Sequence, residues 1–246
     1  MAAPEPPNAA PPVEGRGRGM LLAFTGGFVD TLGFVALFGL FTAHITGNLV
    51  LIGASMGGDG HAGVLGKLVA LPVFVLGVAA TRVFQLRRER RGLDTAAPLV
   101  AVQLAGLVAF MLAGVWAAPF AHGNGAAAIC VGLLGVLAMS VQNTASRSVF
   151  SHLTPTTVMT GNLTQLVMDL VDLANFATGS PDADDKAAAL ARVNKAWPPV
   201  AAFGVGSLTG ALGYAHAGFW VLLVPCLALA ALLRSLRTCP RDGSVT

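Results

Sequence analysis

Thr46-Gly47-Asn48-Leu49 recurs letter for letter at Thr160-Gly161-Asn162-Leu163, 114 positions further along the chain. Each copy places a glycine and an asparagine inside an apolar run. A second match follows in the same order at an offset of 127 positions: Pro72-Val73 with Gly77-Val78, against Pro199-Val200 with Gly204-Val205. The second offset is 13 positions longer than the first, and an insertion of this length can lie in the polar stretch 175–195. Two ordered matches with one insertion indicate that the chain is a duplicated unit.

The composition predicts a membrane protein. Of the 246 residues, 54% are hydrophobic and 11% are charged, whereas soluble domains carry about 25% charged residues. The net charge of +3 is small and the basic residues lie at the ends of apolar runs, which indicates topology rather than nucleic-acid binding. The three cysteines are scattered and predict neither a disulfide framework nor a metal site.

Six apolar runs are long enough to be membrane spans. They cover residues 20–41, 63–85, 97–119, 126–147, 197–215 and 217–236, with a break near Tyr214-Ala215-His216 between the last two. We therefore expect a single transmembrane domain over 20–236, with one repeat at 20–119 and the other at 126–236. Residues 1–19, rich in proline, glycine and arginine, and residues 237–246 are expected to be cytoplasmic tails, the first of them disordered.

The arginines set the orientation. Arg82 and the run Arg87-Arg88-Glu89-Arg90-Arg91 place one connection in the cytoplasm, and the uncharged turn 121–125 then lies outside. The arginines near both chain ends place both termini in the cytoplasm only if neither Thr-Gly-Asn segment crosses the bilayer. Segment 43–57 would reach roughly 22 Å, less than the roughly 30 Å hydrocarbon core.

Each Thr-Gly-Asn segment, 43–57 and 156–174, is therefore expected to be re-entrant or a broken half-helix. Each repeat then has three full spans. Because three is odd, the second repeat is inverted relative to the first, an arrangement found in many transporters. The predicted fold is all-α, with six spans in two inverted three-span repeats.

Asp30 lies midway through the first span, where an ionised carboxylate costs about 2.5–3.5 kcal/mol. It is either a proton, cation or substrate site, or a structural hydrogen-bonding group, with Arg147 as one candidate partner. His44 is either a titrating neighbour of the first Thr-Gly-Asn or an interfacial residue.

The residue types of Thr-Gly-Asn suit a helix break. Glycine frees backbone groups, and threonine or asparagine can cap a new helix whose N-terminus attracts an anion or dipole. The alternative is helix packing, in which glycine allows close approach and asparagine is locally satisfied. The candidate site residues are therefore Asp30, Thr46, Gly47, Asn48, Thr160, Gly161 and Asn162, together with Gln142 and Asn143 at the corresponding depth of the second repeat.

Motifs of soluble enzymes are absent from the sequence: it has no His-Glu-x-x-His, no Gly-x-Ser-x-Gly and no phosphate-binding glycine loop before a lysine. Histidines and cysteines are too dispersed for a metal site. We expect no enzymatic activity, no catalytic residues, no cofactor and no metal.

Several segments together resemble the YoaK family of bacterial inner-membrane proteins. They are Gly27 through Phe34, Thr46-Gly47-Asn48, Met139 through Asn143 and Thr157 through Leu163. The resemblance covers roughly residues 20–236, and Ser140 departs from it where the family pattern has a glycine. It implies a compact multi-pass protein of the cytoplasmic membrane and no particular substrate.

Two functions follow as hypotheses. The first is a small-solute or ion transporter whose site lies where the repeats meet, with Asp30 as the binding or coupling carboxylate. The second is a non-transporting membrane partner or sensor that uses the stretch 175–195 to contact a cytoplasmic protein. The lipid bilayer is the expected surroundings in both cases, no nucleic acid is expected, and the sequence leaves homo-oligomerisation open.

The topology can be tested by cysteine labelling. In single-cysteine variants D59C and H122C, we expect an impermeant maleimide to react from outside the cell, whereas R90C reacts only after the membrane is opened. Reaction of all three from the same side would contradict the inverted arrangement.

Overall fold

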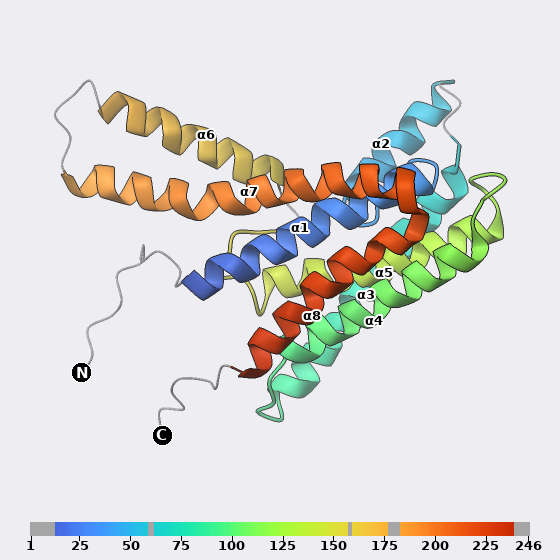
Figure 1. Ribbon diagram of the computed structural model, residues 1–246, viewed down its shortest axis with the longest axis horizontal. Helices are drawn as coiled ribbons and strands as arrows, with labels where there is room; N and C mark the ends of the chain where they lie inside the picture. The colour runs from blue at the N-terminus through green and yellow to red at the C-terminus, as the bar shows by residue number, and fades with distance from the viewer. Residues whose placement is uncertain (1–12, 59–61, 157–158, 177–182, 239–246) are drawn as a thin grey trace.

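The computed structural model describes residues 13–58, 62–156, 159–176 and 183–238, and the regular structure in these ranges is entirely helical (Figure 1). In chain order the helices are α1 (Val13–Ala36), α2 (Ile45–Met56), α3 (Val64–Glu89), α4 (Ala96–Ala117), α5 (Ala126–Arg147), α6 (Met159–Phe176), α7 (Ala183–Ala217), the 3-10 helix η1 (Gly218–Leu222) and α8 (Leu223–Thr238). The prediction of an all-α protein is confirmed.

Within the described ranges, five helical segments are long and apolar enough to cross a membrane. Four of them lie in α1, α3, α4 and α5, and the fifth is the 54-residue stretch Asp185–Thr238, which contains α7, η1 and α8. The chain reverses direction within this stretch at η1, near the predicted break, so α8 returns beside α4 (Figure 1). The 12 residues of α2 reach only about 18 Å. These helices imply a lipid-bilayer environment.

The helices pack in two groups. α1 lies along α7, while α5 packs against both α3 and α4 (Figure 1). α8 contacts α4 and α1 and so connects the groups. α2 packs on α3 and α6 on α7, and α6 with the first half of α7 extends beyond the N-terminal end of α1 (Figure 1). The core combines large buried side chains of α1, α4 and α5, among them Phe28, Leu32, Leu107, Phe110 and Met139.

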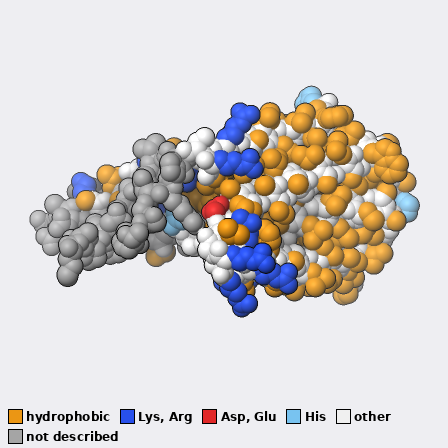
Figure 2. Space-filling model, turned by 90° about the horizontal axis from the view of Figure 1, so that it is seen from below, with side chains coloured by type: hydrophobic (Ala, Val, Ile, Leu, Met, Phe, Trp, Pro, Cys, Tyr) orange, Lys and Arg blue, Asp and Glu red, His pale blue; other side chains and the backbone are white. Residues whose placement is uncertain are grey.

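The outer surface is apolar, as a lipid-facing surface must be. Leu76, Trp116, Leu208 and Leu227 are 67%, 89%, 67% and 68% exposed, respectively. Figure 2 shows Lys and Arg side chains gathered in a band across the molecule, with an almost wholly hydrophobic surface on one side of it. A soluble protein rarely exposes so large an apolar area.

The first helix begins earlier than predicted. Residues 13–19 belong to α1 and not to a disordered tail, because they pack on α7: Arg16 Nη2 donates to the Asn194 carbonyl at 2.7 Å, and Gly19 faces Pro199. This tertiary contact outweighs the poor helix propensity of the glycines. The rest of the predicted tails, residues 1–12 and 239–246, lies outside the described residues, as does labelling position 59.

The stretch 175–195 is also mostly helical, where a polar loop was expected. Its residues 183–195 form the first part of α7, and residues 177–182 lie outside the described ranges. Burial of one face and an ion pair with α6 explain the helix. Ala189 and Val193 are buried, and Arg192 Nε donates to Asp169 Oδ1 at 2.8 Å, with Asp169 itself fully buried. An alanine-rich sequence with one apolar face favours a helix despite its charges.

Glycines bring α1 and α7 into backbone contact. A Cβ on Gly27 would collide with the Phe203 carbonyl, and Cβ atoms on Gly206 and Gly210 would collide with the backbone of Phe24 and Phe28. Small residues four apart allow this close approach, which supplies van der Waals contact where lipid supplies no hydrophobic driving force. We call these three glycines the glycine seam.

The seam predicts a position-specific effect on one helix face. G206A should lower the free energy of unfolding by about 1–3 kcal/mol, because the obstructing atoms are backbone and cannot rotate away. G204A, two residues earlier, places its Cβ in open space and should be neutral or stabilising by up to about 1 kcal/mol. Thermal unfolding of the purified protein measures both, and equal midpoints would contradict the seam.

Candidate functional site

Asp30 holds the chain where it leaves α1. The helix ends at Ala36, five residues earlier than expected, and the following turn contains Phe38 and Gly39 with φ of 55° and 81°. This turn brings the backbone back beside the middle of α1. Asp30 Oδ1 then accepts hydrogen bonds from the N–H groups of Thr42 at 2.7 Å and Ala43 at 2.6 Å.

The remaining contacts of Asp30 complete its hydrogen bonding. Oδ1 is also 3.2 Å from the Thr42 hydroxyl and 3.4 Å from the His44 N–H, and Oδ2 is 2.7 Å from His44 Nδ1. Asp30 is 3% exposed. Its partners are therefore His44 and the backbone before α2, not Arg147, which was the sequence-based candidate.

His44 is the part of this cluster that reaches the surface. Its side chain is 33% exposed, against 5% for that of Asp30. The ring lies edge-on to Phe41 and to Phe203 of α7, with centroids 6.4 and 5.8 Å away. His44 thus lies where the start of α2 meets α7, and it covers the buried carboxylate.

The first Thr-Gly-Asn closes the same turn from the other side. Asn48 Nδ2 donates to the Phe41 carbonyl at 2.8 Å, and Asn48 Oδ1 accepts from the Phe41 N–H at 2.9 Å. The buried side-chain amide of Asn48 thus supplies both hydrogen-bond partners that the backbone of Phe41 needs. A Cβ on Gly47 would lie 2.8 Å from the Phe41 ring, so any larger residue there would displace this ring. Thr46 is exposed.

The second Thr-Gly-Asn repeats this contact in reduced form. Asn162 Nδ2 donates to the carbonyl of Pro155, seven residues earlier, just as Asn48 donates to Phe41. Proline has no N–H, so the reciprocal bond to the amide oxygen cannot form. Asn162 is half-buried, and Thr160 and Gly161 are exposed. No hydrogen bond joins Asn48 to Asn162 within the described part of the chain.

Gln142 is the centre of a second buried polar cluster. Its Oε1 accepts from Gln103 Nε2 of α4 at 2.6 Å, and its Nε2 donates to the Leu22 carbonyl of α1 at 2.8 Å and lies 3.4 Å from the Thr156 hydroxyl. The cluster therefore joins α1, α4 and α5 to the segment before α6. Gly26 lies beside the Gln142 amide, so the face of α1 that carries Asp30 also borders this cluster.

The two clusters hold corresponding positions. Thr156 follows Thr42 by the 114-residue offset of the repeat, and its N–H donates to Ser146 Oγ at 3.2 Å, as the Thr42 N–H donates to Asp30. Asn143 is not part of the second cluster. Its Nδ2 bonds to the Met139 carbonyl of its own helix, and its side chain lines a cleft between α3 and α5.

Lys67 belongs to the site and was not predicted. Its side chain is 1% exposed, and Nζ donates to the carbonyls of Phe38 and Ala62 at 2.7 and 2.6 Å. It thus donates a hydrogen bond to a carbonyl of the turn after α1. Asp30 and Asn48 accept hydrogen bonds from N–H groups of the same turn. A lone lysine near the start of an apolar run was the available signal.

The apolar surface and the two buried polar clusters define a multi-pass transmembrane protein. Residues 18–234 match the family described as "Protein of unknown function (DUF1275)", and the chain belongs to this family. UPF0700 transmembrane protein YoaK of Bacillus subtilis (strain 168) is 31% identical over 150 residues, which cover 61% of this chain and 64% of that protein, less than two thirds. The resemblance to the YoaK family is thereby confirmed. No solved structure matches the chain.

The two asparagines predict unequal effects. N48A leaves the N–H and carbonyl of Phe41 without their partner and should reduce stability by about 1–3 kcal/mol. N162A removes one bond to the backbone and one weak contact with Met159 Sδ at a half-buried position, and should cost about 1 kcal/mol or less. Thermal unfolding of the two variants side by side measures the difference. A larger loss for N162A would contradict the packing described here.

Proposed function

We propose that the protein is a small-solute or ion transporter of the bacterial cytoplasmic membrane, without enzymatic activity, in which Asp30 and His44 form a proton-coupling pair. The observation that carries the proposal is the buried carboxylate that ties a half-length helix to the centre of a bundle. A charged group at this depth is costly, and in membrane proteins such groups mark ion and proton pathways.

The packing supports a two-fold design with six spans and inverted halves. Suppose that α1, α2, α3 and α4 of the first repeat correspond to α5, α6, α7 and α8 of the second. The packed pair α1 and α7 then corresponds to the packed pair α5 and α3, and the packed pair α4 and α8 corresponds to itself. The pair α2–α3 corresponds likewise to α6–α7. In many transporters with inverted repeats, interrupted helices of the two repeats form the substrate and ion site where the repeats meet.

Proton binding would act on the turn before α2. Asp30 Oδ1 is occupied by N–H donors, so a proton reaches the pair at His44 or at Oδ2. When both the imidazole and the carboxyl are protonated, the attraction between them is lost. Residues 42–44 are then held less tightly, and α2 is free to shift relative to α1 and α7.

The orientation in this proposal has both termini in the cytoplasm. The band of Lys and Arg in Figure 2 supports it, because positive residues concentrate on the cytoplasmic side of membrane proteins. α6 and the first half of α7 would then lie toward the cytoplasm, and η1 toward the outside.

The second candidate is a membrane partner or sensor without transport activity. It is favoured by α6, which exposes Leu163, Val167, Met168 and Val171 on a helix that extends past the N-terminal end of α1 (Figure 1). Stabilisation of the pure protein by a small solute would favour the transporter. Stable co-purification of one other protein, with no response to solutes, would favour the partner role.

Proteoliposomes with trapped pyranine test the coupling pair. Under imposed gradients of sugars, amino acids and organic acids, we expect the wild type to move protons with one of these classes. D30N keeps an oxygen acceptor for Thr42 and Ala43 but does not titrate, so its solute-dependent proton entry should fall to that of protein-free vesicles. D172N, an exposed residue of α6, serves as the control and should behave as wild type. Undiminished coupled flux in a folded D30N variant would refute the proposed role.

A further inference from the structure

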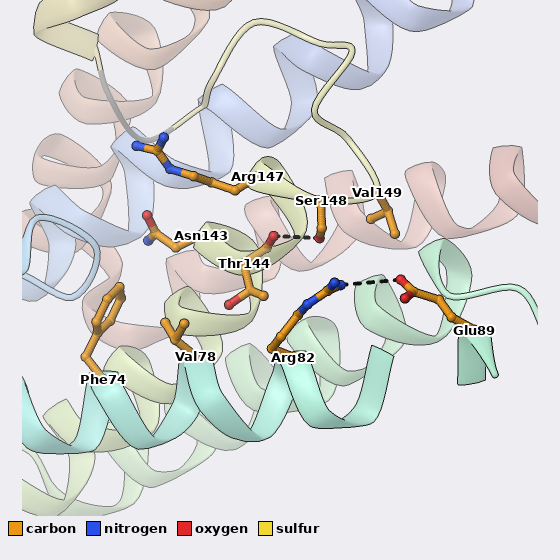
Figure 3. A pocket seen from close by; sticks show the side chains of 9 residues that line it. All are labelled: Phe74, Val78, Arg82, Glu89, Asn143, Thr144, Arg147, Ser148 and Val149. Atoms are coloured by element: carbon orange, nitrogen blue, oxygen red, sulfur yellow. Dashed lines mark hydrogen bonds and ion pairs between the residues drawn. The ribbon is translucent and has the colours of Figure 1, made fainter. Parts of the chain in front are cut away.

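A cleft of about 810 Å³ opens between α3 and α5, and its α5 wall begins at Asn143, next in sequence to Gln142 of the second polar cluster (Figure 3). A volume of this size accommodates a small-molecule ligand. The apolar part of its lining is Phe74, Val78 and Val149, and the polar part is Arg82, Glu89, Asn143, Thr144, Arg147 and Ser148.

The lining changes from apolar to cationic along α3. Phe74, Val78 and Arg82 follow one another at intervals of four residues and so share one face of the helix. Eight residues of helix correspond to about 12 Å, so Phe74 lies about that much deeper than Arg82. Beyond Arg82 the helix continues to the arginine run that starts at Arg87. An amphiphile with its charged end toward this run would match the gradient.

The two arginines are available to a ligand. Arg82 Nη1 is 3.4 Å from both Gln85 Oε1 and Glu89 Oε1, both long contacts, and the side chains of Arg82 and Glu89 are half-exposed. Arg147 is exposed and makes no hydrogen bond or ion pair with any residue in the described ranges. Figure 3 shows Arg82 directed toward Glu89, and Arg147 on the other wall of the cleft with its side chain extended away from Arg82, so both side chains would turn to reach a shared anion. Two cations against one carboxylate leave the cleft positive.

The other polar groups of the cleft offer acceptors more than donors. The hydroxyls of Thr144 and Ser148 donate to the carbonyls of Ser140 and Thr144, and Asn143 Nδ2 donates to the Met139 carbonyl. An anion would therefore be bound by the guanidinium groups, which match phosphate oxygens in pairs.

We propose that this cleft binds the phosphate headgroup of an anionic membrane phospholipid between Arg82 and Arg147, with an acyl chain along Phe74 and Val78. A basic pocket between membrane helices is a recognised type of site for such headgroups. The apolar end of the cleft distinguishes a lipid from a soluble phosphate, which has nothing to place against Phe74. The inference does not depend on transport activity.

The test uses the full-length protein in a neutral detergent, with dioctanoyl phosphatidylglycerol, dioctanoyl phosphatidylcholine and glycerol 3-phosphate as probes. We expect phosphatidylglycerol to raise the thermal midpoint and to remain bound in native mass spectra, and the other two probes to have little effect. R147Q, which disturbs no internal contact, should weaken the apparent affinity roughly fivefold, and R82Q/R147Q should weaken it further. R147K, which keeps the charge, should retain most of the binding.

The control variant is R234Q/R237Q, which removes two arginines from the last turns of α8, outside the cleft. It should bind phosphatidylglycerol as the wild type does. Equal weakening in this variant would assign the effect to general surface charge and overturn the proposal. Equal stabilisation by phosphatidylcholine would show that the arginines do not select an anionic headgroup, and would also overturn the proposal. Equal stabilisation by glycerol 3-phosphate would make the cleft a site for a soluble phosphate, and the lipid assignment would be wrong.

Discussion

A buried carboxylate that accepts backbone N–H groups allows this chain to break a helix at membrane depth. Non-helical backbone in lipid is tolerated only where its polar groups are satisfied within the protein. After Ala36 the turn exposes N–H groups at residues 41–44 and carbonyls at Phe38 and Phe41. Asp30, Asn48 and Lys67 together satisfy these groups, and each comes from a different helix. Without them the turn could not be buried and α2 could not begin where it does.

The second half of the chain meets the same constraint with neutral groups. Ser146, Gln142 and Asn162 contact the segment before α6, where the first half uses a carboxylate, a histidine and a lysine. Pro155 removes an N–H that would otherwise need a partner. The ionisable groups are thus concentrated around one of two similar breaks. The two breaks therefore have similar backbone contacts but differ in the charge of the side chains that hold them.

The fold could be anticipated to the extent that it depends on composition and length. The apolar runs located α3, α4, α5 and the turn near His216, and the recurrence of Thr-Gly-Asn located α2 and α6. The N-terminal start of α1 and the first half of α7 were missed. Both are helical because of contacts between them and with α6, such as Arg192 with Asp169, and no local periodicity encodes such contacts.

The candidate site was anticipated in its residues more than in its contacts. Asp30, Asn48 and Gln142 could be identified because each is a polar residue inside an apolar run, where a polar side chain is costly unless it has a partner or a function. Their partners depend on how the chain turns at Phe38 and Gly39, where two positive φ angles return the backbone to α1. For that reason the contact of His44 with Asp30, and that of Lys67 with the same turn, could be identified only in the folded structure.

The two corresponding helix pairs differ in how tightly they close. α1 and α7 meet backbone to backbone along the glycine seam, with no space for a single methyl group. α3 and α5 also approach closely at Gly77 and Ser140, and Gln85 Nε2 donates to Ser148 Oγ at 2.6 Å toward the arginine-rich end, but a cleft of about 810 Å³ lies between them. A closely packed pair resists sliding, because any shift brings backbone atoms into collision. The α1–α7 pair therefore has no space for a ligand along the glycine seam, whereas the α3–α5 pair has, and a molecule bound there would fill the space that the packing leaves.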